Sequence, residues 1–99
     1  MKIVIIIPVY NEQPVIRSVI NELKKFHYSN IIVVDDGSND NTYGEAKKAG
    51  SIVLRHRMNR GKGAGVKTGI EAAKKMDADV VVSFDGDGQH DPQDIKHIL

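Results

Sequence analysis

Four short apolar runs with helical patterns between them limit the folds open to this chain of 99 residues. The runs cover residues 2–7, 30–34, 51–54 and 79–84, and the first two consist almost entirely of Ile and Val. A strand without polar alternation is buried on both faces, which is typical of parallel sheets covered by helices. The sequence therefore predicts a three-layer α/β/α fold with a mostly parallel sheet.

Helical patterns or helix-boundary residues occupy the segments between and after these runs. The first predicted helix follows Asn11, which suits an N-cap, and its apolar positions continue to residue 26. Further helices are predicted over residues 40–49, from the glycine-rich turn 61–65 to Met76, and from Pro92 to the chain end at Leu99. Right-handed crossovers place the carboxyl ends of all parallel strands at one edge of the sheet. The polar clusters at residues 8–12, 35–38 and 85–89 are therefore expected to meet where α/β sheets bind ligands.

Composition excludes several classes of function. The formal net charge of +1 gives no bias towards nucleic acid or an anionic membrane surface. The absence of cysteine removes disulfides, thiolate metal sites and cysteine nucleophiles, and it suits a reducing compartment. No stretch reaches transmembrane length, and Pro8 ends the first apolar run too early for a signal peptide. We expect one domain, or one piece of a domain, in the cytoplasm.

Two carboxylates, Asp85 and Asp87, follow the last buried run in the sequence Asp-Gly-Asp-Gly. Side chains two residues apart at a strand end point the same way. Hard oxygen ligands in that arrangement suit Mg²⁺ or Mn²⁺, with water and substrate phosphates completing the coordination. The alternative is a polar turn that ends the strand and binds nothing.

The glycine-rich stretch over residues 61–69 also has two interpretations. It nearly spells a phosphate-binding P-loop, but Val66 stands where that motif needs a glycine. One interpretation is a helix N-terminus, flanked by Arg60 and Lys62, that faces a diphosphate. The other is that Gly65 and Gly69 let the helix pack closely on the sheet, and we expect both to hold. The basic run at residues 55–57 is interpreted as solvated surface, with Arg60 alone expected to touch phosphate.

The acid pair Asp35-Asp36 follows the second buried run. Phosphate-receiver domains carry a comparable pair after the first strand, so the order of motifs does not fit them. Two roles remain for Asp36: capping backbone amides in a turn, or accepting hydrogen bonds from a nucleotide base or ribose. Tyr10 either stacks on a base or covers the first helix, and the sequence does not decide between these roles.

Four motifs in order resemble family 2 glycosyltransferases, especially the branch with dolichyl-phosphate mannose synthases and polyprenyl-phosphate glucosyltransferases. They are IPVYNE (7–12), VVDDGS (33–38), NRGKG (59–63) and DGDGQHDP (85–92). The resemblance implies a GT-A fold, with a Rossmann-like nucleotide-binding half and strand order 3-2-1-4. It also implies that a nucleotide-diphosphate sugar, linked to UDP or GDP, binds through Mg²⁺ or Mn²⁺.

The resemblance also assigns roles to individual residues. Those implied to contact the nucleotide sugar are Pro8, Tyr10, Glu12, Asp36, Arg60, Lys62 and Asp85. Those implied to bind the metal are Asp85, Asp87 and Gln89, with Asp87 the principal ligand. Within the first set, Arg60 and Lys62 would lie near the diphosphate, and the residues before them would line the nucleoside pocket.

Members of that family continue past the point where this chain stops, with further strands, an acceptor-binding half and a general base. We therefore expect residues 1–99 to be the donor part of a GT-A domain, truncated at its C-terminus. The implied enzyme is an inverting, metal-dependent glycosyltransferase using a GDP-mannose or UDP-glucose class donor and an acceptor such as polyprenyl phosphate. A polyprenyl-phosphate acceptor implies that the protein also works at the inner face of the membrane. No catalytic base is assigned, because Asp91 fits the cap of a following helix.

Two alternatives and one assembly prediction accompany this interpretation. The chain could be a non-catalytic nucleotide-binding module that needs a partner chain, or a sugar-phosphate nucleotidyltransferase. The latter ranks last because Pro-Val-Tyr-Asn stands where its glycine-rich signature is expected. In the order 3-2-1-4 the fourth strand, residues 80–84, lies at the sheet edge without a Lys or Pro to protect it. We therefore predict self-association, or a partner chain, through that exposed strand.

Overall fold

The computed structural model describes residues 1–85 and the short strand Lys96–Ile98. These residues form one sheet in the order β3-β2-β1-β4-β5. Its strands are β1 (Ile3–Val9), β2 (Ile31–Asp35), β3 (Ile52–Arg55), β4 (Val80–Ser83) and β5 (Lys96–Ile98). The first four strands run parallel to one another, and β5 pairs antiparallel with β4. The predicted parallel sheet and the strand order 3-2-1-4 are confirmed.

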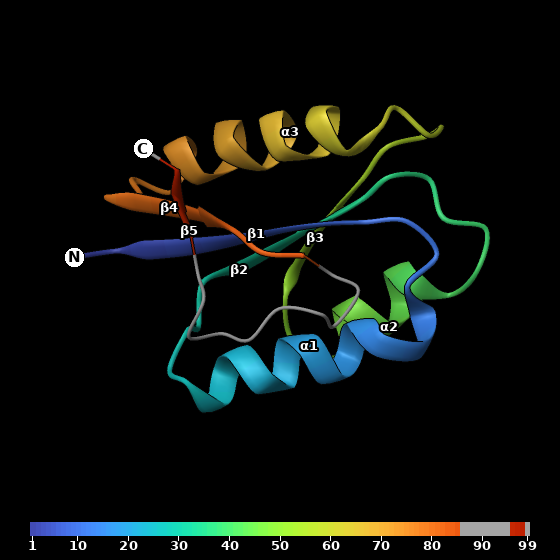
Figure 1. Ribbon diagram of the computed structural model, residues 1–99, viewed down its shortest axis with the longest axis horizontal. Helices are drawn as coiled ribbons and strands as arrows, with labels where there is room; N and C mark the ends of the chain where they lie inside the picture. The colour runs from blue at the N-terminus through green and yellow to red at the C-terminus, as the bar shows by residue number, and fades with distance from the viewer. Residues whose placement is uncertain (86–95, 99) are drawn as a thin grey trace.

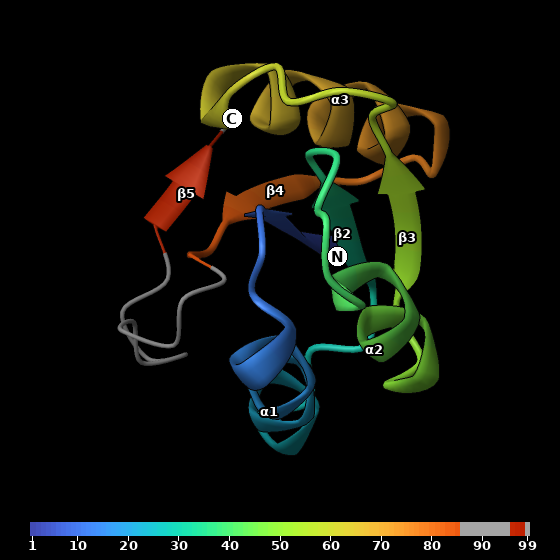
Figure 2. The same ribbon diagram turned by 90° about the vertical axis from the view of Figure 1, so that its right-hand side faces the viewer.

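Helices cover both faces of the sheet, as Figures 1 and 2 show. The helices α1 (Gln13–Lys25) and α2 (Thr42–Lys48) lie side by side on one face, and α3 (Lys62–Lys75) lies on the other. Alternate residues of β1 enter two separate cores: Ile5 and Ile7 pack on the α1 side, and Val4 and Ile6 pack on the α3 side. This two-sided burial explains why the first apolar run has no polar alternation.

Small residues let α3 approach the sheet closely. Gly65, Gly69 and Ala73 are buried at successive turns on one side of the helix. A Cβ atom added to Gly69 would lie 2.4 Å from Cγ2 of Ile6, and one added to Gly65 would lie 3.1 Å from Cβ of Pro8. The packing role predicted for these two glycines is therefore confirmed. Their close approach also brings the N-terminus of α3 to the ends of β1 and β2 (Figure 1).

The C-terminal part of the chain differs from the sequence prediction. Residues 96–98 form a strand, so the helix predicted from Pro92 to Leu99 is wrong there, and its remaining residues lie outside the described part of the chain. In β5, Ile98, His97 and Lys96 pair with Val81, Val82 and Ser83 of β4 (Figure 2). The prediction that β4 is an exposed edge is therefore wrong, because the chain folds back and pairs its own strand there. The predicted self-association or partner binding through β4 is therefore not supported.

Among the described residues, none of the helices is long and apolar enough to cross a membrane.

Candidate functional site

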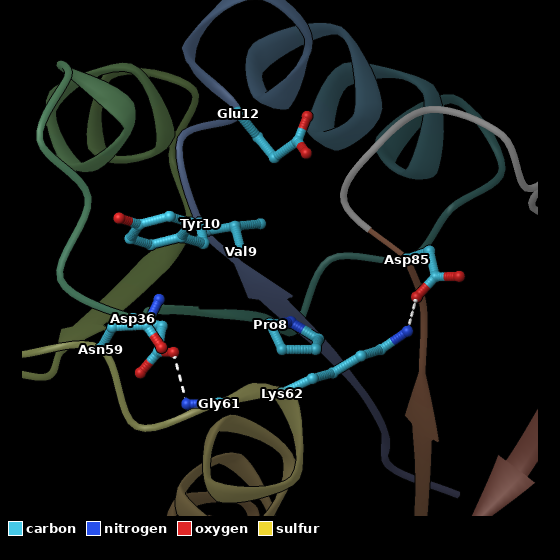
Figure 3. A pocket seen from close by; sticks show the side chains of 9 residues that line it. All are labelled: Pro8, Val9, Tyr10, Glu12, Asp36, Asn59, Gly61, Lys62 and Asp85. Atoms are coloured by element: carbon cyan, nitrogen blue, oxygen red, sulfur yellow. Dashed lines mark hydrogen bonds and ion pairs between the residues drawn. The ribbon is translucent and has the colours of Figure 1, made fainter.

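An open pocket of about 270 Å³ lies at the carboxyl ends of β1, β2 and β4, beside the N-terminus of α3 (Figure 3). Its lining consists of Pro8, Val9, Tyr10, Glu12, Asp36, Asn59, Gly61, Lys62 and Asp85. The structure thus brings together Pro8, Tyr10, Glu12, Asp36, Lys62 and Asp85 from the predicted nucleotide-sugar set. Arg60 does not line this pocket, although its backbone amide bonds to Asp36.

Three residues that line the pocket were not predicted from the sequence: Val9, Asn59 and Gly61. All three lie within the quoted motifs, Val9 in IPVYNE and Asn59 and Gly61 in NRGKG, so proximity to the predicted site residues was the available signal.

The loop after β1 is fastened to the loop after β2 by side-chain hydrogen bonds. The Asn11 amide donates to Oγ of Ser38 at 2.8 Å, and Oδ1 of Asn11 accepts from the Asn39 amide at 2.8 Å. The Glu12 amide donates to Oγ1 of Thr42 at 2.9 Å. Glu12, not Asn11, is the N-cap position of α1, and Asn11 instead adopts a positive φ of 53° that short polar side chains tolerate. These bonds fix Asn11 and the backbone of Glu12, directly after the pocket residue Tyr10.

The two acids after β2 have separate surroundings. Asp35 is fully buried; its Oδ1 accepts from the amide and hydroxyl of Ser38, and its Oδ2 lies 3.4 Å from Nε of Arg55. Arg55 also donates to the Ser38 carbonyl at 3.2 Å, which closes the turn. Asp35 therefore stabilises the loop, while Asp36 is the acid that lines the pocket.

The Asp36 carboxylate accepts three hydrogen bonds. Oδ1 lies 2.8 Å from Nδ1 of His56 and 2.8 Å from the Arg60 amide, and Oδ2 lies 2.7 Å from the Gly61 amide. Burial by itself raises the pKa of Asp36, but the hydrogen bonds from His56, Arg60 and Gly61 outweigh burial and leave the pKa below its usual value. Asp36 is thus ionised at neutral pH and acts only as a hydrogen-bond acceptor.

This pKa shift predicts an acid-dependent stability. A carboxyl whose pKa is lower in the folded state stabilises the fold above its unfolded pKa, about 3.9, and loses that contribution as pH falls through the folded pKa. We expect wild type to exceed Asp36→Asn in free energy of unfolding at pH 6, with the difference shrinking below about pH 4. Urea denaturation from pH 6 to pH 2.5 measures this; a difference that stays constant in acid would contradict the assignment.

Lys62 and Asp85 meet across the pocket from Asp36. Nζ of Lys62, in the first turn of α3, donates to Oδ1 of Asp85, which follows β4 (Figure 3). The Lys62 side chain is mostly exposed, so this ion pair stays accessible to a ligand. The pocket therefore carries an acceptor carboxylate at one end and a cation beside a second carboxylate at the other.

The metal assignment rests partly on residues outside the described structure. Asp87 and Gln89 lie there, and the described residues contain no cluster of three or more His, Cys, Asp or Glu side chains able to hold a metal. Asp85 is the one predicted ligand that is described. Its hard oxygen atoms lie in the pocket wall and suit one ligand position of a divalent ion, which would share the carboxylate with the Lys62 ammonium.

Comparison with known families and proteins gives a consistent result. The family model described as glycosyl transferase family 2 matches residues 4–99. The chain is 44% identical over 98 residues to an uncharacterised protein of Methanocaldococcus jannaschii, covering 99% of this chain and 40% of that protein. It is 40% identical to the UDP-N-acetylglucosamine–dolichyl-phosphate N-acetylglucosaminyltransferase of Methanococcus voltae, covering 98% of this chain and 45% of the relative. The chain thus spans less than half the length of either relative.

A solved structure shares the fold. Glucosyl-3-phosphoglycerate synthase of Mycobacterium tuberculosis, in complex with Mn²⁺, UDP and glucosyl-3-phosphoglycerate, superposes with a TM-score of 0.70 and 26% identity. The match covers 86% of this chain and 33% of that one. The same enzyme has also been solved with Mg²⁺ and UDP.

Proposed function

Because the chain belongs to glycosyl transferase family 2, we propose that its pocket binds the nucleotide-diphosphate sugar donor of a glycosyl transfer reaction. The observation that carries this proposal is the polarity of the pocket. Asp36 accepts hydrogen bonds at one end, and the basic Lys62 lies beside Asp85 at the other. A nucleotide-diphosphate sugar has the matching polarity, with hydrogen-bond donors on its base and ribose and negative charge on its diphosphate.

The residues predicted from sequence, in and beside the pocket, have proposed tasks. Asp36 accepts a hydrogen bond from a base imide or a ribose hydroxyl. The partly exposed Tyr10 covers the nucleoside with its ring, and Pro8 and Glu12 complete that end. Lys62, with Arg60 just before it, neutralises the diphosphate at the N-terminus of α3.

A divalent cation, Mg²⁺ or Mn²⁺, completes the proposed site. Asp85 would hold it together with Asp87 and Gln89, with Asp87 as the principal ligand. When bound, the cation supplies positive charge that stabilises the leaving diphosphate. The M. tuberculosis enzyme, solved with Mn²⁺ or Mg²⁺ and UDP, supports a cation of this class.

The whole-protein reaction is proposed as inverting transfer to an acceptor such as polyprenyl phosphate. The name of the M. voltae relative includes dolichyl phosphate and a UDP-sugar, which supports that acceptor class and a UDP-linked donor. The other donor that we propose is GDP-mannose. No described residue is assigned as the general base. The alternative is a non-catalytic nucleotide-binding module that requires a partner chain. Measuring sugar transfer to polyprenyl phosphate by the chain alone and with partner chains distinguishes this module from a transferase.

Calorimetric titration with UDP, GDP and their sugar conjugates tests the donor proposal directly. We expect binding of one nucleotide class, and we expect Mn²⁺ to tighten it because the cation compensates the diphosphate charge. Asp87→Ala should abolish the gain from Mn²⁺ while leaving metal-free binding unchanged.

Glu71→Ala is the matched control, since Glu71 is an exposed carboxylate of α3 outside the pocket lining. It should behave as wild type. Equal affinities of wild type and Asp87→Ala at saturating Mn²⁺ would remove Asp87 from the metal site, and absence of binding to every nucleotide would overturn the donor proposal.

A further inference from the structure

His56 is buried, with 8% of its surface exposed, although it stands between two arginines in a run interpreted from sequence as solvated surface. Its backbone amide donates to the Asp35 carbonyl at 2.9 Å, which holds the residue at the end of β3 beside β2. Its ring is thereby directed into the interior behind Asp36. A buried, doubly hydrogen-bonded imidazole next to a pocket carboxylate calls for a functional explanation.

Both ring nitrogens of His56 have partners on other elements. Nδ1 lies 2.8 Å from Oδ1 of Asp36 after β2, and Nε2 lies 2.9 Å from Oγ1 of Thr68 on α3. Since the ionised Asp36 can only accept, Nδ1 must carry a hydrogen atom. Nε2 then accepts from the Thr68 hydroxyl when the ring is neutral and donates to it when the ring is charged. The bridge from Asp36 to α3 therefore exists in either charge state.

The bonds to Asp36 are distributed unequally over its two oxygens. A carboxylate offers about four acceptor positions, two on each oxygen. Among the described residues, His56 and the Arg60 amide fill two positions on Oδ1, and the Gly61 amide fills one on Oδ2. One position on Oδ2 is left for a ligand in the pocket that Asp36 lines.

The loop that carries those two amides also packs against Gly37, the residue directly after Asp36. Gly37 has a φ of +77°, and a Cβ atom there would lie 3.0 Å from the carbonyl carbon of Met58 and 3.2 Å from the Asn59 nitrogen. The segment 58–61 therefore packs directly on the turn after Asp36. The Asp36 carboxylate is therefore held by the loop amides and by His56, which is itself hydrogen-bonded to Thr68.

We propose that His56 is a positioning residue for nucleotide recognition: it saturates Oδ1 of Asp36 from the interior so that Oδ2 is presented to the nucleoside. This inference rests on the proposed donor-binding function. It adds a source of base selectivity, because a fixed, acceptor-only oxygen favours a base edge with a ring N–H, as in uracil and guanine. Cytosine presents a lone pair on its N3 atom and is disfavoured.

A pair of amide variants separates positioning from mere packing. The side-chain nitrogen of Asn occupies the place of Nδ1 in a histidine, and that of Gln occupies the place of Nε2. We expect His56→Asn to keep UDP or GDP affinity near wild type, because it still donates to Asp36. We expect His56→Gln to lose about tenfold, the effect of one weakened charge-assisted hydrogen bond.

The measurement is calorimetric titration of wild type and both variants with UDP, GDP and, as the unmatched base, CDP. His56→Gln should lose affinity for UDP or GDP while its CDP affinity changes little, so that selectivity falls. In an Asp36→Ala background, His56→Gln should cost no further nucleotide affinity, since its effect passes through Asp36.

The outcomes that overturn the inference are distinct from failure of the donor proposal. Equal affinities for the Asn and Gln variants, or equal proportional losses for all three nucleotides, would show that His56 only supports the fold. Additive losses in the Asp36→Ala background would show the same. If wild type binds none of the nucleotides, both this inference and the donor proposal are overturned.

Discussion

Replacing Asp36 with alanine is expected to weaken binding of UDP or GDP by about 10- to 100-fold, the loss of one charge-assisted hydrogen bond. Binding of Mn²⁺ without nucleotide should change little, because the proposed metal ligands follow β4 and Asp36 follows β2. Calorimetric titration of nucleotide and of metal, each alone, distinguishes the two effects.

Asp36→Asn is the matched variant for this prediction. It keeps the size of the side chain and one acceptor oxygen for the Arg60 or Gly61 amide, but it replaces the other oxygen with a donor. We expect an affinity between those of wild type and Asp36→Ala. A fall in Mn²⁺ affinity, with the preference among nucleotides unchanged, would instead place Asp36 with the metal ligands.

Much of the fold was predictable because burial on two faces leaves a simple signal. Continuous apolar strands such as β1 and β2 are typical of a sheet with helices on both sides, and α1 showed regular helical spacing. The strand β5 gave no comparable signal. It has three residues, Lys96–Ile98, too few for a period to appear, and its formation depends on pairing with a distant strand.

The candidate site was predictable as a location more than as a set of contacts. The ends of parallel strands share an edge, so Tyr10, Asp36 and Asp85 could be placed together without a structure. The resemblance selected Asp36 for the pocket, but the role of Asp35 could not be predicted from residue type. Both acids follow β2, and they differ in the groups that they meet: the nearby Ser38 for Asp35 and the distant His56 for Asp36.

His56 illustrates the same limit. Its sequence neighbours Arg55 and Arg57 favour an exposed segment, but contacts to residues 20 positions before it and 12 positions after it bury its ring. Backbone donors such as the Gly61 amide are also invisible to residue-type reasoning, because every non-proline residue carries one. Such contacts depend on the close packing of α3 on the sheet, which can itself be tested.

Substituting alanine for Gly69 is expected to destabilise the fold by about 1–3 kcal/mol, whereas Gly63→Ala should be neutral or stabilising by up to about 1 kcal/mol. Both changes replace glycine with a better helix former within α3, so a loss of stability in Gly69→Ala must come from packing. A Cβ at position 69 would lie 2.4 Å from Cγ2 of the fully buried Ile6, while one at position 63 meets nothing within 4 Å. Relieving that clash requires α3 or the Ile6 side chain to shift. A shift of α3 away from β1 also draws the Gly61 amide from Asp36 and should weaken nucleotide binding. Urea denaturation of the three proteins measures the stabilities; equal values for the two variants would show that α3 does not depend on the close contact at Gly69.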